Sequence, residues 1–160
     1  VEHHAVDRMV RLINLTPDRG IVLTNATFRV RAAHRGNRLG ARALAIQVQA
    51  AGREGFDAIE LDALGSYAES IVKHWDDRLI GYWLWPRLGF DAPIPAHVLA
   101  KLSPQFAGCK SVSELMVTED GVKEWLVYGD SLQGARFDLS EESASRKLLL
   151  RYLNTHGIKL

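Results

Sequence analysis

The sequence from Phe28 to Gly40 reads Phe-Arg-Val-Arg-Ala-Ala-His-Arg-Gly-Asn-Arg-Leu-Gly, and the rest of the chain is best understood from it. An apolar run ending at Val30 passes into a basic turn that carries Gly36 and Gly40. Helix-forming residues, 41–51, follow without a break. A strand, a glycine-bearing loop and a helix in this order aim backbone N–H groups and a helix N-terminus at one spot. That arrangement favours an anion such as phosphate.

Two strands are expected before this turn. Residues 5–15 alternate loosely between apolar and polar side chains, and Ile21 to Arg31 reads as a second strand. Regular alternation in the second strand gives it two faces: Thr24, Ala26, Phe28 and Val30 on one, and Leu23, Asn25, Thr27 and Arg29 on the other. The turn Pro17-Asp18-Arg19-Gly20 between the two strands predicts a β-hairpin.

The residues after the basic turn predict a βαβ unit. We expect a helix from about Arg38 to Gly52, ended by Gly52 and Gly55, and then a third strand from Phe56 to Ala63. Because strand, helix and strand are joined by short connections, the third strand should lie beside the second and parallel to it. Residues 67–80 predict a mostly helical excursion, and 81–90 a short helix closed by a glycine.

The C-terminal part predicts mainly helices. Short helices are expected at 96–102 and after Ser111, a helix or a strand at 121–128, a short strand at 135–139, and a helix from Glu141 to about Thr155 capped by Ser140. The fold class predicted from these elements is α/β (α+β): a mixed, twisted sheet with flanking helices, in a single domain over 1–160.

Charge is distributed unevenly along the chain. The composition, 47% hydrophobic and 24% charged, is typical of a globular protein, and a net charge of +1 creates no overall field that would attract nucleic acid or membrane. Six arginines and no acidic residue lie between Arg29 and Arg53, whereas acidic residues predominate from Glu114 to Asp130. The positive charge therefore gathers on the predicted anion-binding loop.

Cysteine usage and hydropathy bear on location. The single cysteine, Cys109, excludes an internal disulfide and fits a reducing compartment. No signal peptide is visible, and no apolar run approaches the ~20 residues of a membrane-spanning helix, so we expect a cytoplasmic protein with no membrane partner. No metal site is predicted, since the adjacent His3 and His4 would face opposite sides of a strand. The first residue is Val1 rather than Met, which leaves open a parent multidomain protein.

The stretch from Val30 to Ala41 resembles the acyl-CoA loop of the GCN5-related N-acetyltransferase (GNAT) superfamily. The family pattern is Gln or Arg, two residues, Gly, one residue, then Gly or Ala; Arg35 and Gly40 match its ends, and Arg38 replaces its central glycine. Leu88-Gly89-Phe90 is similar to the closing Leu-Gly-Phe of the family, so the resemblance covers about 20–92. The segment from Trp125 through Phe137-Asp138-Leu139-Ser140, with the final Leu- and Tyr-bearing helix, looks like the tails of GNAT-like domains at the ends of phage and bacterial toxin-type multidomain proteins. It belongs to a mostly helical C-terminal extension over about 93–160.

The resemblance implies a GNAT-like sheet with a shortened N-terminus and a mostly helical C-terminal extension. It implies acetyl-CoA or another acyl-CoA as cofactor. It implies two sets of cofactor-binding residues. Pantetheine would pair, where two strands splay apart, with Phe28, Arg29 and Val30. The pyrophosphate would be held by Arg35, Gly36, Asn37, Arg38, Leu39, Gly40 and Ala41. Arg38 can adopt ordinary helical backbone angles, but its side chain can block the close backbone approach that glycine allows.

The chemistry that the resemblance implies is transfer of an acyl group to an amine acceptor by direct attack on the thioester. Trp85 stands where the family often has a tyrosine as general acid, so Tyr82, one helical turn earlier, is the candidate acid. Asp62, at the end of the third strand, is the candidate base, with His74 or a bound water as alternatives. The competing structural interpretations are a packed Tyr82 bonded to a backbone carbonyl, an Asp62 that caps the next segment, and an exposed His74.

Two other functions stay open. Trp85, Arg38 and the lack of a glutamate on the second strand favour a non-catalytic GNAT-fold module that binds CoA or a protein partner. The Arg29–Arg53 cluster alone would suit a nucleic-acid backbone, but no stacking platform or RNA motif accompanies it. The sequence does not identify the amine acceptor.

Overall fold

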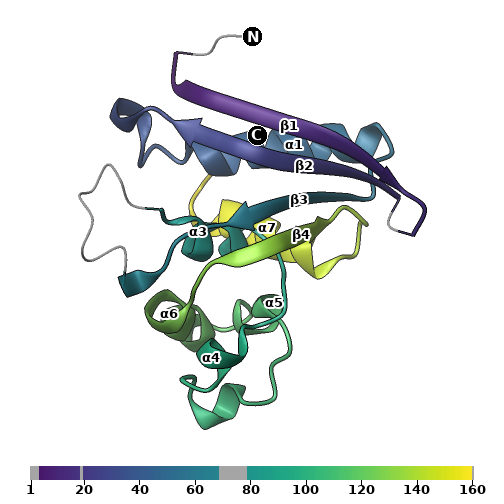
Figure 1. Cartoon of the computed structure of the whole chain (residues 1–160). Coiled ribbons are helices and arrows are strands. Elements are labelled where there is room, and N and C mark those ends of the chain that lie inside the picture. The colour runs from purple at the N-terminus through teal and green to yellow at the C-terminus, as the bar shows by residue number, and fades with distance from the viewer. Residues whose placement is uncertain (1–3, 19, 69–78, 160) are drawn as a thin grey trace.

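The computed structural model describes residues 4–18, 20–68 and 79–159 and builds them around one sheet (Figure 1). The strands are β1 (Val6–Thr16), β2 (Gly20–Val30), β3 (Ala58–Ala63) and β4 (Leu132–Asp138), side by side in the order β1-β2-β3-β4. β1 runs antiparallel to β2, β2 parallel to β3, and β3 antiparallel to β4. The predicted hairpin, the parallel βαβ unit and the mixed sheet with flanking helices are confirmed.

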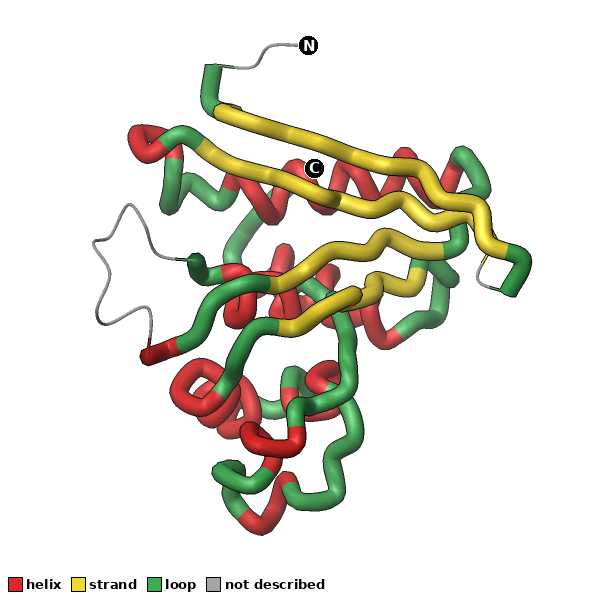
Figure 2. The backbone as a smooth tube through the Cα atoms, viewed as in Figure 1, coloured by secondary structure: helices red, strands yellow, loops and turns green. Residues whose placement is uncertain are grey.

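The helices lie to one side of the sheet and below it. They are α1 (Leu39–Arg53), α3 (Gly81–Arg87), α4 (Ala96–Leu99), α5 (Val112–Leu115), α6 (Glu119–Tyr128) and α7 (Ala144–Thr155), with 3-10 turns at Ala32–His34 and Pro104–Phe106. Figure 2, in the same view as Figure 1, shows α1, α3 and α7 behind the sheet and the remaining helices below β4. In the described part of the chain, the face of the sheet toward the viewer carries no helix.

Helix ends depart from prediction by a few residues, each for a local reason. α7 begins at Ala144 because the hydroxyl of Ser143, not that of Ser140, caps it by accepting from the Arg146 N–H at 3.2 Å. α1 continues through Gly52 to Arg53. The segment that read as helix or strand is α6, whose first turn is capped by Thr118.

A β-bulge changes which residues of β2 face α1. Val10 pairs with Thr27 and Arg11 with Asn25, so Ala26 is an extra residue in β2. Asn25 and Phe28 would point to opposite faces of a regular strand, yet both line one pocket against α1. Asn25 and Gln47 of α1 also exchange two side-chain hydrogen bonds, at 3.0 and 2.8 Å. The predicted faces are therefore wrong for one half of the strand, because alternation reverses at the bulge.

The C-terminal half belongs to the same sheet and core as the N-terminal half. β4 pairs with β3, and Asp91, just after α3, forms an isolated bridge with Arg136 of β4. Trp125 of α6 is fully buried, and its Nε1 donates to the backbone carbonyl of Tyr82 at 2.7 Å. The predicted C-terminal extension is thus packed into the domain and supports α3 from below.

Candidate functional site

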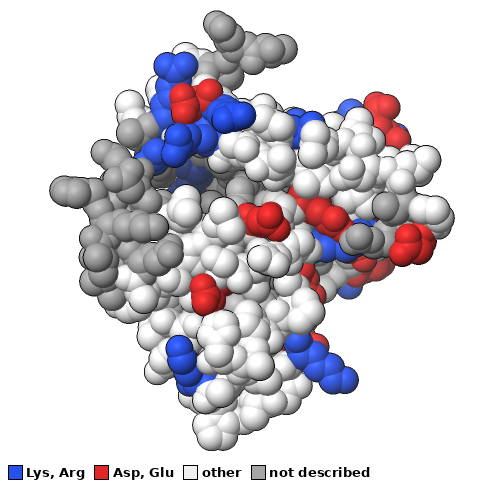
Figure 3. Space-filling view, viewed as in Figure 1, with Lys and Arg blue, Asp and Glu red and all other residues white. Residues whose placement is uncertain are grey.

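β2 and β3 start side by side and then diverge. Their parallel register covers Val22↔Ala58, Leu23↔Ile59 and Thr24↔Glu60. Within the described residues no later part of β2 pairs with β3, although β2 continues to Val30 along β1. The ribbon shows the two strands separating toward their C-terminal ends, and the space-filling view shows a hollow there with Lys and Arg atoms at its rim (Figures 1 and 3). A parallel pair that opens at its C-terminal end exposes backbone groups that a ligand can bind.

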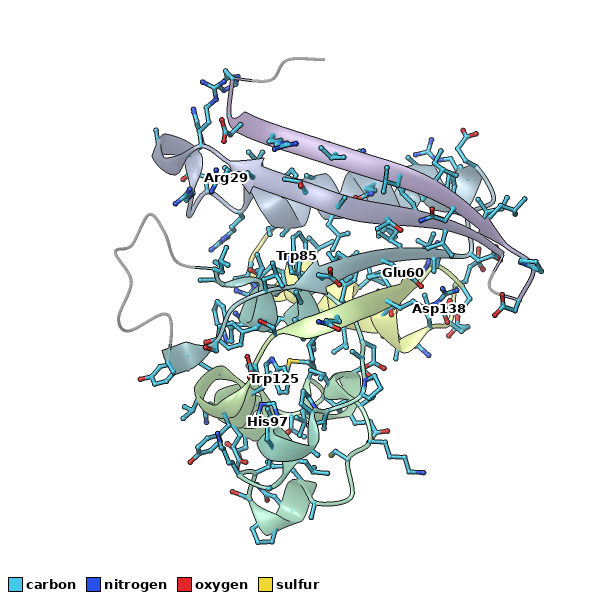
Figure 4. The ribbon with its side chains drawn as sticks, viewed as in Figure 1. Arg29, Glu60, Trp85, His97, Trp125 and Asp138 are labelled. Atoms are coloured by element: carbon cyan, nitrogen blue, oxygen red, sulfur yellow. The ribbon has the colours of Figure 1, made fainter. Side chains whose placement is uncertain are left out.

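A narrow pocket, open to solvent, lies between strands β1 and β2 on one side and helices α1 and α3 on the other. Its apolar wall consists of Phe28, Gly40, Ala43, Leu44 and Trp85, and its polar wall of Arg11, Asn25 and Gln47. Trp85 also packs edge-on against Phe90, with ring centroids 5.6 Å apart. In Figure 4, Trp85 is seen in the opening between β2 and β3. The tryptophan thus acts as an apolar wall of this pocket.

The loop between β2 and α1 keeps the backbone that a glycine would adopt. Arg38 has φ 57° and ψ 18°, and it is the only described non-glycine residue with positive φ. The backbone of Arg38 thus departs from the ordinary helical angles that the sequence allowed. The left-handed conformation costs a residue with a Cβ about 1–2 kcal/mol, and the Arg38 guanidinium helps to hold it by donating to the carbonyl of His156. Arg38 therefore gives the loop a backbone conformation that is usually supplied by glycine.

The N-terminus of α1 lacks a protein cap. Arg38, at the N-cap position, makes no side-chain cap hydrogen bond, and the first turn holds no acidic residue. Helix starts leave several backbone N–H groups without an intrahelical acceptor, and the helix dipole adds partial positive charge at the same place. Gly40, in this first turn, lines the pocket. The first turn of α1 is thus an electropositive surface with no protein anion to neutralise it in the described part of the chain.

Arginines surround this helix start. Arg29, Arg31 and Arg38 are exposed. Arg29 forms an exposed ion pair with Asp7, in which Nη1 lies 3.9 Å from Oδ2. Arg35 is half-buried and donates from Nε to the carbonyl of Val30 at 3.1 Å, which ties the loop back to the end of β2. Figure 3 shows the basic side chains together above the hollow, and Figure 4 locates Arg29 among them. Arg29, at the end of β2, is thus one of the basic side chains above the hollow.

Tyr82 does not line the pocket. Its side chain is 2% exposed, and its hydroxyl donates to the carbonyl of Leu126 in α6 at 3.1 Å. The structure therefore matches the alternative in which Tyr82 is a packed aromatic bonded to a backbone carbonyl. Tyr82 instead anchors α3 to α6 through two hydrogen bonds. Its hydroxyl donates to Leu126, and its backbone carbonyl accepts from the Trp125 side chain.

Asp62 lies two residues beyond the last β2–β3 pair, on the β3 side of the opening. Its side chain is exposed, and Oδ1 accepts from the backbone N–H of Gly134 at 2.8 Å. The β3–β4 register shifts between Leu61 and Ala63, so this N–H lies in an irregular part of the ladder, which Asp62 satisfies. The other carboxylate oxygen, Oδ2, takes no part in this bond.

One carboxylate near the opening was missed in the sequence. Glu60 forms the last pair with β2, at Thr24, and bonds to Arg136 of β4 at 2.9 Å. Its side chain is 17% exposed. The sequence pattern did not indicate that Glu60 lies at the opening, because the point where β2 and β3 diverge depends on how the two strands pair. The candidate base His74 lies outside the described residues.

Among the described residues, no helix is long and apolar enough to cross a bilayer, and no group of three or more His, Cys, Asp or Glu side chains is arranged to hold a metal ion. Comparisons with protein-family models, curated proteins and solved structures find no match.

Proposed function

We propose that this chain is an acyl-CoA-dependent N-acyltransferase of the GNAT-like type, with acetyl-CoA or another acyl-CoA as the acyl donor. The single observation that carries the proposal is that two structural features occur at the same place. The uncapped, arginine-rich start of α1 lies where β2 loses its pairing with β3. One feature suits a pyrophosphate, and the other suits an extended chain with amide groups, and both occur in coenzyme A.

The binding mode follows from these two features. The backbone N–H groups from Gly36 to Ala41 would donate to the pyrophosphate, with the arginines supplying charge. Pantetheine would lie along the inner edge of β2 up to Val30, where its amides replace those of a neighbouring strand. Phe28 and Trp85 would cover its apolar parts, since both line the pocket behind the strands.

The chemistry needs few protein groups. An uncharged amine attacks the thioester carbonyl carbon, a C–N bond forms, and the C–S bond breaks as the tetrahedral intermediate collapses. Asp62 is the proposed acceptor for the proton that the amine loses, directly or through water. The departing thiolate takes a proton from water in this scheme, because the Tyr82 hydroxyl is bonded to Leu126.

The second candidate function is a non-catalytic CoA-binding module. The burial of Tyr82 favours it, since the chain then lacks a tyrosine at the pocket in the place where the family often has its acid. In this alternative the hollow binds coenzyme but transfers no acyl group.

Two measurements separate these functions. Isothermal titration with acetyl-CoA tests the site, and loss of binding at millimolar ligand overturns both functions. Release of free thiol from acetyl-CoA over a panel of amines tests the enzyme. Binding with no amine-dependent thiol release would leave the module and exclude the transferase for that panel.

A further inference from the structure

Four planar side chains form a ladder beside the start of α1. The guanidinium carbon of Arg87, at the end of α3, lies 4.4 Å from the ring centre of Trp83 and 5.2 Å from that of Tyr152 in α7. Tyr152 in turn stacks on His156, with ring centroids 4.0 Å apart and planes inclined by 21°. The guanidinium is therefore fixed between two aromatic rings.

The ladder is joined to the candidate pyrophosphate loop. Arg38, the residue before α1, donates to the backbone carbonyl of His156, at the opposite end of the ladder from Trp83. Two short steps, His156 to Tyr152 and Tyr152 to Arg87, thus lead from the loop to the guanidinium. The ladder therefore connects Arg87 to the start of α1.

Two side chains of this ladder, Arg87 and Trp83, have no hydrogen-bond acceptor among the described residues. Arg87 has no hydrogen-bond acceptor and no carboxylate partner among the described residues, although it is half-buried. Burial lowers the pKa of Arg87, and nearby Tyr152 partly offsets this. The Nε1 of Trp83 is buried and has no hydrogen-bond partner in the described structure. Stacked rings satisfy the faces of a guanidinium but not its N–H donors, which point outward in the guanidinium plane.

We propose that Arg87 binds the 3′-phosphate on the ribose of coenzyme A, so that the site selects coenzyme A over dephospho-coenzyme A. This inference rests on the proposed coenzyme site. A phosphate suits the arrangement because it offers several acceptors to a planar, pre-oriented donor set. Stacking between Trp83 and Tyr152 fixes the guanidinium before the ligand arrives, which lowers the entropic cost of binding.

The test compares two ligands on four proteins: the wild-type chain and three variants. Titration calorimetry measures the Kd of coenzyme A and of dephospho-coenzyme A, which lacks only the 3′-phosphate. The wild-type chain should prefer coenzyme A by ~10-fold or more, the size of one charge-assisted contact. Arg87→Gln should abolish this preference, and Arg87→Lys should reduce it. Arg53→Gln is the matched control, since Arg53 is exposed at the other end of α1.

The ratio of the two affinities distinguishes recognition from packing. A variant that merely loosens α3 or α7 weakens both ligands equally and leaves the ratio intact, which would overturn the inference. Equal affinity of the wild-type chain for the two ligands would also overturn it, while leaving the proposed function in place. Failure of the wild-type chain to bind either ligand would refute the proposed function as well. If Arg87→Gln does not fold, the wild-type ratio and Arg87→Lys still decide the matter.

Discussion

Gly40 offers a substitution in which stability and ligand binding should move in opposite directions. A Cβ at this position would meet only Phe28, at 3.8 Å from its Cε1, which is ordinary van der Waals contact. The first turn of α1 contains no acidic residue. An aspartate there interacts favourably with the helix dipole by about 0.3–1 kcal/mol. For a domain of this size, each kcal/mol raises Tm by about 2–4 °C, so Gly40→Asp should fold at least as well as the isosteric Gly40→Asn.

The same carboxylate should strongly weaken coenzyme binding. A bound pyrophosphate at the helix start would lie roughly 5 Å from it, and two unit charges at that separation repel by about 3 kcal/mol at an effective dielectric constant of 20. Solvent and salt reduce this value. We therefore expect acetyl-CoA to bind Gly40→Asp ~10- to 100-fold more weakly than Gly40→Asn.

The assay combines thermal unfolding with titration calorimetry at low and moderate salt. The pair Gly40→Asp and Gly40→Asn share size and backbone effects, so their difference isolates the charge. The difference in Kd should shrink as salt rises, because the repulsion is screened. Equal acetyl-CoA affinity of the two variants would refute the assignment of the pyrophosphate to the first turn of α1.

Variants at three further positions test particular contacts. Arg38→Gly should be more stable than Arg38→Ala by about 1 kcal/mol in denaturant unfolding, because both lose the side chain but only alanine has a Cβ in the left-handed conformation. Tyr82→Phe should lower the free energy of unfolding by about 1 kcal/mol through loss of the bond to Leu126, and leave acetyl-CoA affinity unchanged. Asp62→Asn should keep the bond from Gly134 through its amide oxygen, and so retain the fold, while lowering amine-dependent thiol release by at least ~10-fold.

For each of these variants, a different result would contradict the structural interpretation. Equal unfolding energies for the two Arg38 variants would argue against a positive φ at that residue. A Tyr82→Phe variant that kept full stability but lost turnover would restore Tyr82 as the general acid. Undiminished thiol release from Asp62→Asn, in a protein that is otherwise active, would transfer the role of base to Glu60 or to water.

Local sequence signals predicted the elements well and their spatial relations only in part. The hairpin turn and the strand–loop–helix–strand order follow from short-range chain geometry, so β1, β2, α1 and β3 appear close to where the pattern indicated them. The bulge at Ala26 was not predictable in this way, because an extra residue in one strand depends on the register with its partner. That bulge decides that Phe28 lines the pocket behind β2.

In the candidate site, too, some features follow from local sequence and others from tertiary packing. The sequence alone determined the basic loop, its glycines and the helix that follows, since these depend on residues within one turn of chain. Only the tertiary structure decided that β2 and β3 part after Thr24, that Tyr82 is bonded to Leu126, and that the Arg87 guanidinium lies over the ring of Tyr152. These facts join residues that lie tens of positions apart in the chain. Their contacts arise from packing between elements, which local propensity does not encode.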